Sequence, residues 1–97
     1  MKVVWQAPAE AELDAAIDYY YFHAGVAVST DFRHEVERVT KLLREHALLG
    51  VQVRHNTRRL PLHGYPFDLV YRMRRDSSIV VALALQHRRP GYWVGRR

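Results

Sequence analysis

The sequence contains no cysteine. This absence excludes a disulfide-stapled scaffold, a thiolate metal site and a cysteine nucleophile. The longest purely apolar run, residues 79–85, is far shorter than the ~20 residues that span a bilayer. Polar Gln6, Glu10 and Glu12 interrupt the N-terminal segment early, so we expect no signal peptide and a cytoplasmic protein. With 97 residues, the chain has room for a single domain, residues 1–97, with one hydrophobic core.

Basic charge is concentrated in the second half of the chain, which contains no lysine. The net charge is +5, but residues 54–97 hold ten arginines against two acids, whereas residues 1–53 hold five basic side chains against eight acids. Arginine pairs with phosphate and carboxylate groups through two parallel hydrogen bonds. A half in which arginine replaces lysine throughout therefore indicates a surface that binds an anionic partner. A solvated basic surface in a GC-rich genome would give the same composition.

Residues 2–49 have the spacing of one short strand followed by two helices. A β-branched and aromatic run at residues 2–6 predicts the strand. Apolar residues then recur every three or four positions, which predicts a helix that starts near Pro8 and stops at Gly25. The second helix runs to about residue 49, and its expected cap is Ser29, Thr30 or Asp31. Because the connection around Gly25 is short, the two helices should form an antiparallel hairpin.

After residue 50 the apolar side chains alternate with a period of two. Three strands are predicted, at residues 58–62, 67–74 and 79–85. The last run is apolar on both faces, so its strand should be the most buried one. The order β-α-α-β-β-β predicts an α+β fold in which an N-terminal strand and a helical hairpin precede a three-stranded antiparallel sheet. The expected core residues on these strands are Leu60, Leu62, Leu69 and Tyr71.

The sequence offers few groups for catalysis. Ser77 and Ser78 lie in a predicted turn with no histidine nearby in sequence, which argues against a serine nucleophile. The six histidines lack the short spacing typical of metal ligands, and no glycine-rich phosphate loop is present. We therefore expect no metal and no cofactor.

Arginines on the predicted strands and an aromatic, arginine-rich C-terminal segment remain as candidate functional residues. Strand alternation places Arg59 and Arg72 away from the core positions. Such a face could bind RNA, DNA or an acidic protein. It could also cleave RNA without a metal, although arginine cannot carry the proton. The proton carriers would then be His63, His87 or Tyr92. For Trp93 the alternative is that it packs the C-terminal segment onto the sheet.

Several sequence segments form a pattern that spans the predicted elements. They are residues 15–21 with their tyrosine cluster, FRHEVE at 32–37, TRRLPL at 57–62, GYPF at 64–67, LVYR at 69–72 and RRPGYW at 88–93. Together with the early strand, these segments resemble the ParE branch of the RelE/ParE toxin superfamily. The resemblance covers nearly the whole chain in the same element order.

This resemblance implies a toxin of a type II toxin–antitoxin system, a kind of system associated with plasmid stabilisation. ParE-like toxins act on DNA gyrase and block replication, whereas RelE-like toxins are ribosome-dependent mRNA endonucleases. RelE-like enzymes have an arginine just before the Leu-Val-Tyr motif, and Asp68 stands at that position here. A RelE-like site would use Arg88, Tyr92 and His87. Leu85 and His87 also depart from the histidine and arginine of ParE-like tails.

On this basis the chain is predicted to be a non-catalytic, ParE-like inhibitor of DNA gyrase, with a RelE-like endonuclease as the alternative. Its candidate target-binding residues are Arg59, Arg72, Arg88, Arg89, Tyr92 and Trp93. The second expected partner is a small acidic antitoxin, ParD-like or similar, that lays an amphipathic helix, with or without an added strand, over the groove between hairpin and sheet. DNA contact is expected only through the antitoxin complex, and no membrane contact is expected.

Overall fold

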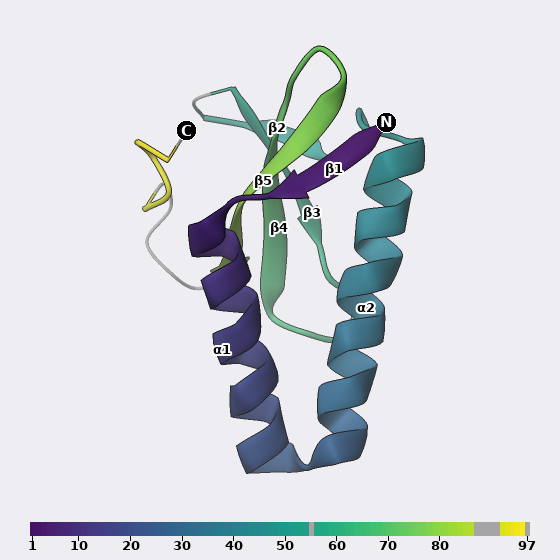
Figure 1. The fold of residues 1–97 in the computed structure, drawn as a ribbon, viewed down its shortest axis with the longest axis vertical. Coiled ribbons are helices and arrows are strands. Elements are labelled where there is room, and N and C mark those ends of the chain that lie inside the picture. Colours follow the sequence, from purple (N-terminus) through teal and green to yellow (C-terminus); the bar gives the residue numbers. More distant parts are fainter. Residues whose placement is uncertain (55, 87–91, 97) are drawn as a thin grey trace.

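The computed structural model describes residues 1–54, 56–86 and 92–96. These residues form two helices and five strands in one α+β fold (Figure 1). The elements in chain order are β1 (Lys2–Trp5), α1 (Ala7–Ala24), α2 (Val26–Glu45), β2 (Val51–Val53), β3 (Thr57–Pro61), β4 (Phe67–Met73) and β5 (Ser77–Leu85). The strands form a single sheet in the order β1-β5-β4-β3-β2. The two helices form an antiparallel hairpin whose tip extends beyond the sheet (Figure 1).

The sheet is larger than the predicted one and is mixed rather than antiparallel. β3, β4 and β5 form the expected antiparallel unit. β2 adds a further antiparallel strand beside β3. It has three residues, which are too few to show the alternation of apolar and polar side chains that identifies a strand. β1 joins the other edge and pairs parallel with β5, from Lys2 beside Ser77 to Trp5 beside Val80. The α+β fold class and the antiparallel β3-β4-β5 unit are thus confirmed, whereas the three-stranded extent of the sheet was wrong. Spacing reveals strands but not their distant partners.

The second helix begins earlier than predicted, because Gly25 alone makes the turn between the helices. Its φ of 92° is readily adopted only by glycine. The Gly25 N–H donates to the Tyr21 carbonyl at the end of α1, and its own carbonyl accepts from the Ser29 N–H in α2. No side chain caps α2. The predicted cap at Ser29, Thr30 or Asp31 was wrong: the buried Ser29 hydroxyl instead donates to the Ile17 carbonyl across the hairpin, at 3.3 Å.

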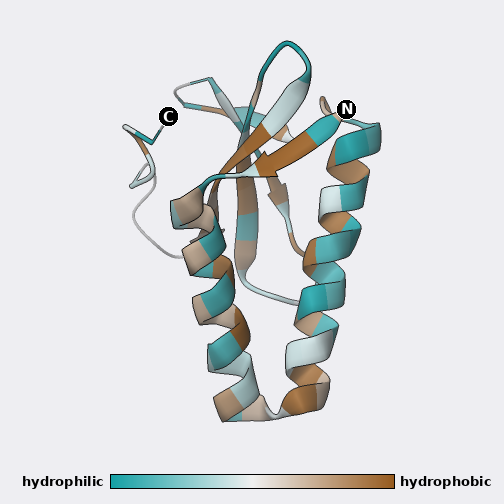
Figure 2. Ribbon diagram, viewed as in Figure 1, coloured by the Kyte–Doolittle hydropathy of each residue, from teal (hydrophilic) through white to brown (hydrophobic). Residues whose placement is uncertain are grey.

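Two apolar clusters cover the two faces of the sheet. The larger cluster joins buried helix residues such as Phe32 and Leu43 to the predicted core residues of β3 and β4. The smaller one lies on the opposite face and consists of Val70, Val81, Ala82 and Ala84, packed against Ile79 and the C-terminal aromatic residues Tyr92 and Trp93. Both faces of β5 are thus covered, as its apolar sequence predicts. Figure 2 shows the hydrophobic residues along the central strands and a hydrophilic turn between β4 and β5.

A β-bulge in β5 determines which of its residues face each cluster. Val70 pairs with Ala82 and Tyr71 pairs with Val80, so Val81 is the extra residue. The bulge puts both Val81 and Ala82 on the face of the smaller cluster. It also redirects the backbone N–H and C=O groups of the strand after residue 80, where pairing with β1 ends.

Candidate functional site

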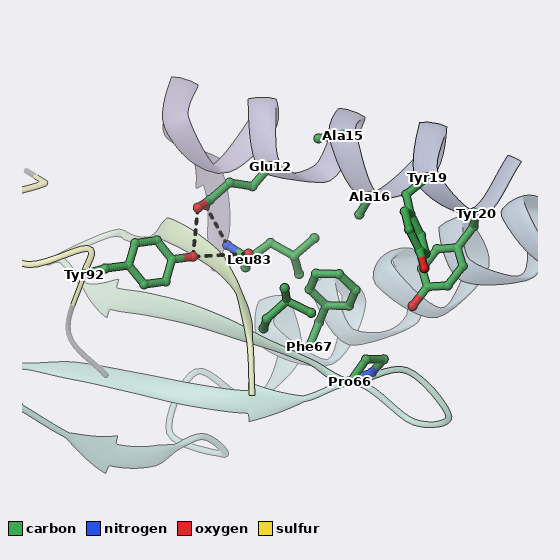
Figure 3. A pocket seen from close by; sticks show the side chains of 10 residues that line it. Glu12, Ala15, Ala16, Tyr19, Tyr20, Pro66, Phe67, Leu83 and Tyr92 are labelled. Atoms are coloured by element: carbon green, nitrogen blue, oxygen red, sulfur yellow. Dashed lines mark hydrogen bonds between the residues drawn. The ribbon is translucent and has the colours of Figure 1, made fainter. Parts of the chain in front are cut away.

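An apolar groove runs between α1 and the sheet. Its volume is about 680 Å³. Small Ala15 and Ala16 leave space on the helix, and aromatic Tyr19 and Tyr20 close one end of the groove (Figure 3). The remaining lining residues are Glu12 on α1, Pro66, Phe67, Leu83, Leu85 and Tyr92. Burial raises the pKa of the Tyr20 phenol above its ordinary 10.0, and neighbouring Tyr19 adds to the shift.

One end of this groove borders a strand edge that β1 leaves open. In the part of the chain that the structure describes, no strand pairs with this edge of β5 beyond Val80. Three side chains meet its backbone groups instead. The Leu83 N–H donates to Glu12 Oε1 at 3.2 Å, Arg96 Nη1 donates to the Val81 carbonyl at 3.0 Å, and the Tyr92 hydroxyl lies 3.5 Å from the Leu83 carbonyl. Side chains thus satisfy groups that would otherwise be free to pair with another strand.

Glu12 is the centre of these contacts (Figure 3). Its Oε2 accepts a hydrogen bond from the Tyr92 hydroxyl at 2.8 Å, and its Oε1 forms an ion pair with Arg96 Nη1 at 2.9 Å. The two side chains of this pair are only 24% and 25% exposed. The Arg96 guanidinium also lies 5.3 Å from the centre of the Tyr92 ring, within cation–π range. One carboxylate therefore links α1, β5 and the C-terminal tail, by which we mean residues 92–96.

Trp93 and Arg72 hold the tail against the face of the sheet opposite the helices. Trp93 packs on the smaller apolar cluster, in edge-to-face contact with Tyr92 at 5.3 Å between ring centres. Its indole Nε1 is buried and has no hydrogen-bond partner among the described residues. On β4, Arg72 Nη1 donates to the Arg96 carbonyl. The alternative interpretation of Trp93, as a residue that packs the tail onto the sheet, is what the structure shows.

Arg59 lies on the same face of the sheet as the tail. It pairs with Val70 across the strands, and directly opposed residues share a face. Arg59 Nη1 lies 3.4 Å from Asp68 Oδ2, and the Asp68 side chain is 11% exposed whereas that of Arg59 is 47% exposed. Gln86 Nε2 donates to the other Asp68 oxygen at 3.2 Å. Asp68 therefore pairs with Arg59 and holds it in place, and about half of the Arg59 side chain stays exposed to a partner.

The structure brings four of the predicted site residues onto one face. Arg72 is two positions from Val70 on β4, so it shares the face of Arg59, and the tail aromatics pack there as well. His63 lies elsewhere, in the β3–β4 turn, where its backbone N–H donates to Glu35 of α2. The predicted residues Arg88, Arg89 and His87 lie outside the described residues.

Glu12 was not among the site residues predicted from the sequence. Its position in the sequence could have indicated this role, because Glu12 is four residues before Ala16 and eight before Tyr20, on the apolar stripe of α1. A carboxylate on an apolar stripe requires a partner. Among the described residues, no group of three histidine, aspartate or glutamate side chains could hold a metal ion. None of the described helices is long and apolar enough to cross a membrane.

Comparisons with known proteins identify the family and a similar fold. A family model described as "ParE toxin of type II toxin-antitoxin system, parDE" matches residues 3–92. A solved structure described as "Chromosomal ParDE TA system from P. aeruginosa" is similar in fold, with a TM-score of 0.77 and 23% identity. The match covers 88% of this chain and 95% of the other. No curated protein matches the chain.

Proposed function

Because the chain belongs to the ParE toxin family of type II toxin–antitoxin systems, we propose that it inhibits DNA gyrase and thereby blocks replication. The observation that carries this proposal is the common face of Arg59, Arg72, Tyr92 and Trp93. Arginine and large aromatic residues supply most of the binding energy at protein interfaces. A face that gathers both is suited to bind a macromolecule.

The contacts of this face favour binding over RNA cleavage. A cleavage site needs a group that exchanges a proton with the substrate. Here the Tyr92 hydroxyl donates to Glu12, and Arg72 donates to a backbone carbonyl. His63 lies in the β3–β4 turn near Glu35 and not beside the tail. These contacts support a role of the described residues in fixing a binding surface. A RelE-like endonuclease is the alternative outcome of the test.

A cognate antitoxin is the second proposed partner. The groove between α1 and the sheet is lined mostly by apolar side chains and would accept the apolar face of an amphipathic helix. Residues 54–97 carry a net charge of +8, from ten arginines minus two acids, which suits a small acidic, ParD-like partner. A strand added to β5 at Leu83 would have to take the Leu83 N–H from Glu12. DNA contact is assigned to the antitoxin in this proposal, and not to this chain.

The target is tested with purified components. The chain is added to purified DNA gyrase in a supercoiling assay, and in parallel to translating ribosomes with a defined mRNA. We expect supercoiling to be inhibited and the mRNA to remain intact. Cleavage of the mRNA together with uninhibited supercoiling would replace the proposal with the RelE-like alternative.

Matched arginine variants test the proposed surface in the same assay. Arg88→Ala with Arg89→Ala removes two of the predicted target-binding residues, whereas Arg33→Ala with Arg44→Ala removes two exposed arginines from α2. Loss of a charge-assisted contact is worth roughly 1.5–3 kcal/mol, so the Arg88/Arg89 variant should need at least about tenfold more protein for the same inhibition. The α2 variant should inhibit like the unchanged chain. Equal loss in both would assign the effect to overall charge.

A further inference from the structure

We propose that Glu12 is a positioning residue: its carboxylate holds the C-terminal tail, residues 92–96, in the place from which the tail contacts the target. The target part of this inference rests on the proposed function, whereas the placement of the tail does not. Glu12 itself lies on the first turns of α1, on the groove side of the sheet edge. It acts through Tyr92 and Arg96 and need not touch the target.

The contacts of Glu12 join three separate parts of the chain. The carboxylate is on α1, it accepts a hydrogen bond from the backbone N–H of Leu83 on β5, and its other two donors are Tyr92 and Arg96 on the tail. Tyr92 is 80 residues and Arg96 is 84 residues from Glu12 in sequence. A carboxylate can accept from several donors at once, and hydrogen bonds to a charged group are about twice as strong as neutral ones. No neutral side chain of this size satisfies all three donors.

The rest of the tail has few other polar anchors among the described residues. Arg72 holds the Arg96 carbonyl, and Arg96 Nη1 also reaches the Val81 carbonyl. Trp93 contributes apolar packing, but its buried Nε1 has no hydrogen-bond partner among the described residues, and a buried donor without a partner costs free energy. The docked position therefore depends on the charged contacts around Glu12 more than on the indole.

Placement of the tail is tested first, without any partner. In Glu12→Ala, the Leu83 amide should exchange its hydrogen about tenfold faster, because it loses its acceptor. The Trp93 indole resonance should also move towards its position in an unfolded chain. Glu12→Gln keeps an acceptor but loses the charge, so its effect should be intermediate. Unchanged exchange at Leu83 together with an unchanged indole resonance in Glu12→Ala would overturn the inference.

Glu10→Gln is the matched control. Glu10 lies in the first turn of α1, two residues before Glu12, and is exposed. Its substitution removes the same charge near the same helix end. It should leave both the Leu83 amide and the Trp93 resonance unchanged. If the control moves them as much as Glu12→Gln does, the effect belongs to helix charge and the inference fails.

A charge exchange separates positioning from general structural damage. Arg96→Glu alone places two carboxylates together and should release the tail. Adding Glu12→Arg restores an opposite pair at the same place, and should recover much of the Trp93 resonance shift. A double variant no better than the worse single variant would count against a specific Glu12–Arg96 contact.

The gyrase assay then links tail placement to function. The more a variant shifts the Trp93 resonance, the more weakly it should inhibit gyrase. Glu12→Ala should inhibit at least about tenfold more weakly than Glu10→Gln. A released tail with undiminished inhibition would overturn the functional part. If the unchanged chain fails to inhibit gyrase while Glu12→Ala still releases the tail, the proposed target is wrong and the positioning role stands.

Discussion

Arg72 of β4 donates a hydrogen bond from its guanidinium to the backbone carbonyl of Arg96, 24 residues later in the chain. Strand alternation alone places Arg72 on a face away from the core, free to bind a partner. In the folded chain this face is partly covered by the tail, and Arg72 is one of the side chains that hold the tail there. The arginine thus contributes to the proposed target surface mainly by fixing other residues.

Replacing Arg72 with alanine should loosen the tail without unfolding the domain. The lost hydrogen bond from a charged donor is worth about 1.5–3 kcal/mol to tail docking. In a Trp5→Phe background Trp93 is the single remaining tryptophan, so its fluorescence reports the tail directly. Its emission should shift to longer wavelength and become easier to quench. Arg74→Ala, at an exposed position just after β4, should leave the emission unchanged.

Tyr71 is predicted to be a strong contributor to stability. It is fully buried, its hydroxyl donates to the Ala47 carbonyl at 2.6 Å, and it accepts the Gly50 N–H at 3.0 Å. Tyr71→Phe leaves both backbone groups without this partner and should lower the free energy of unfolding by about 1–3 kcal/mol. Denaturant unfolding measures the change. Tyr21→Phe, at an exposed position on α1, should change it by less than about 0.5 kcal/mol.

Glu35 should make stability sensitive to acid. Hydrogen bonds from Arg38 lower the pKa of Glu35, and the His63 N–H adds to the effect. Because the folded-state pKa is below the unfolded one, the stabilisation is present above the ordinary value of 4.5 and is lost as the pH falls through the folded pKa. Glu35→Gln should cost about 1 kcal/mol at neutral pH.

The measurement for Glu35 is the free energy of unfolding as a function of pH. The difference between the unchanged chain and Glu35→Gln should shrink as the pH falls below 4.5. Glu37→Gln, an exposed neighbour on α2, should show no such convergence. A constant difference at all pH values would show that the charge of Glu35 is not the source.

Tyr65 should make stability sensitive to alkali. Burial and the hydrogen bond to Asp31 raise the pKa of Tyr65 to about 12 from its ordinary 10.0. Between these values the unfolded chain releases the phenol proton and the folded chain keeps it, so stability should fall as the pH rises from 10 to 12. Tyr65→Phe should reduce this slope in denaturant titrations, whereas Tyr21→Phe should not. An unchanged slope in Tyr65→Phe would contradict the assignment.

The local parts of the fold could be predicted from the sequence. Gly25 marks the turn of the hairpin, and the apolar run of β5 correctly indicates a strand covered on both faces. The pairing of β1 with β5 could not be predicted, because it joins segments more than 70 residues apart. The short β2 gave too little alternation to detect.

For the site, the sequence allowed prediction of the residue types and of the strand face on which the two arginines lie. Arg59 and Arg72 were placed on the correct face, and Trp93 packs as its alternative interpretation has it. Alternation could not show that these arginines have partners of their own, since Asp68 and Arg96 reach them through tertiary contacts. The role of Glu12 likewise depends on the bulge at Val81, which turns the edge groups of β5 towards it and which no local pattern reveals.

Whether this toxin acts on gyrase or cuts RNA can be decided by inducing the chain alone in bacteria. Plasmid supercoiling and the integrity of transcripts are then followed in the same cells. We expect growth arrest, loss of negative supercoiling and intact transcripts. Transcripts cut at defined codon positions while plasmids keep their supercoiling would contradict this expectation.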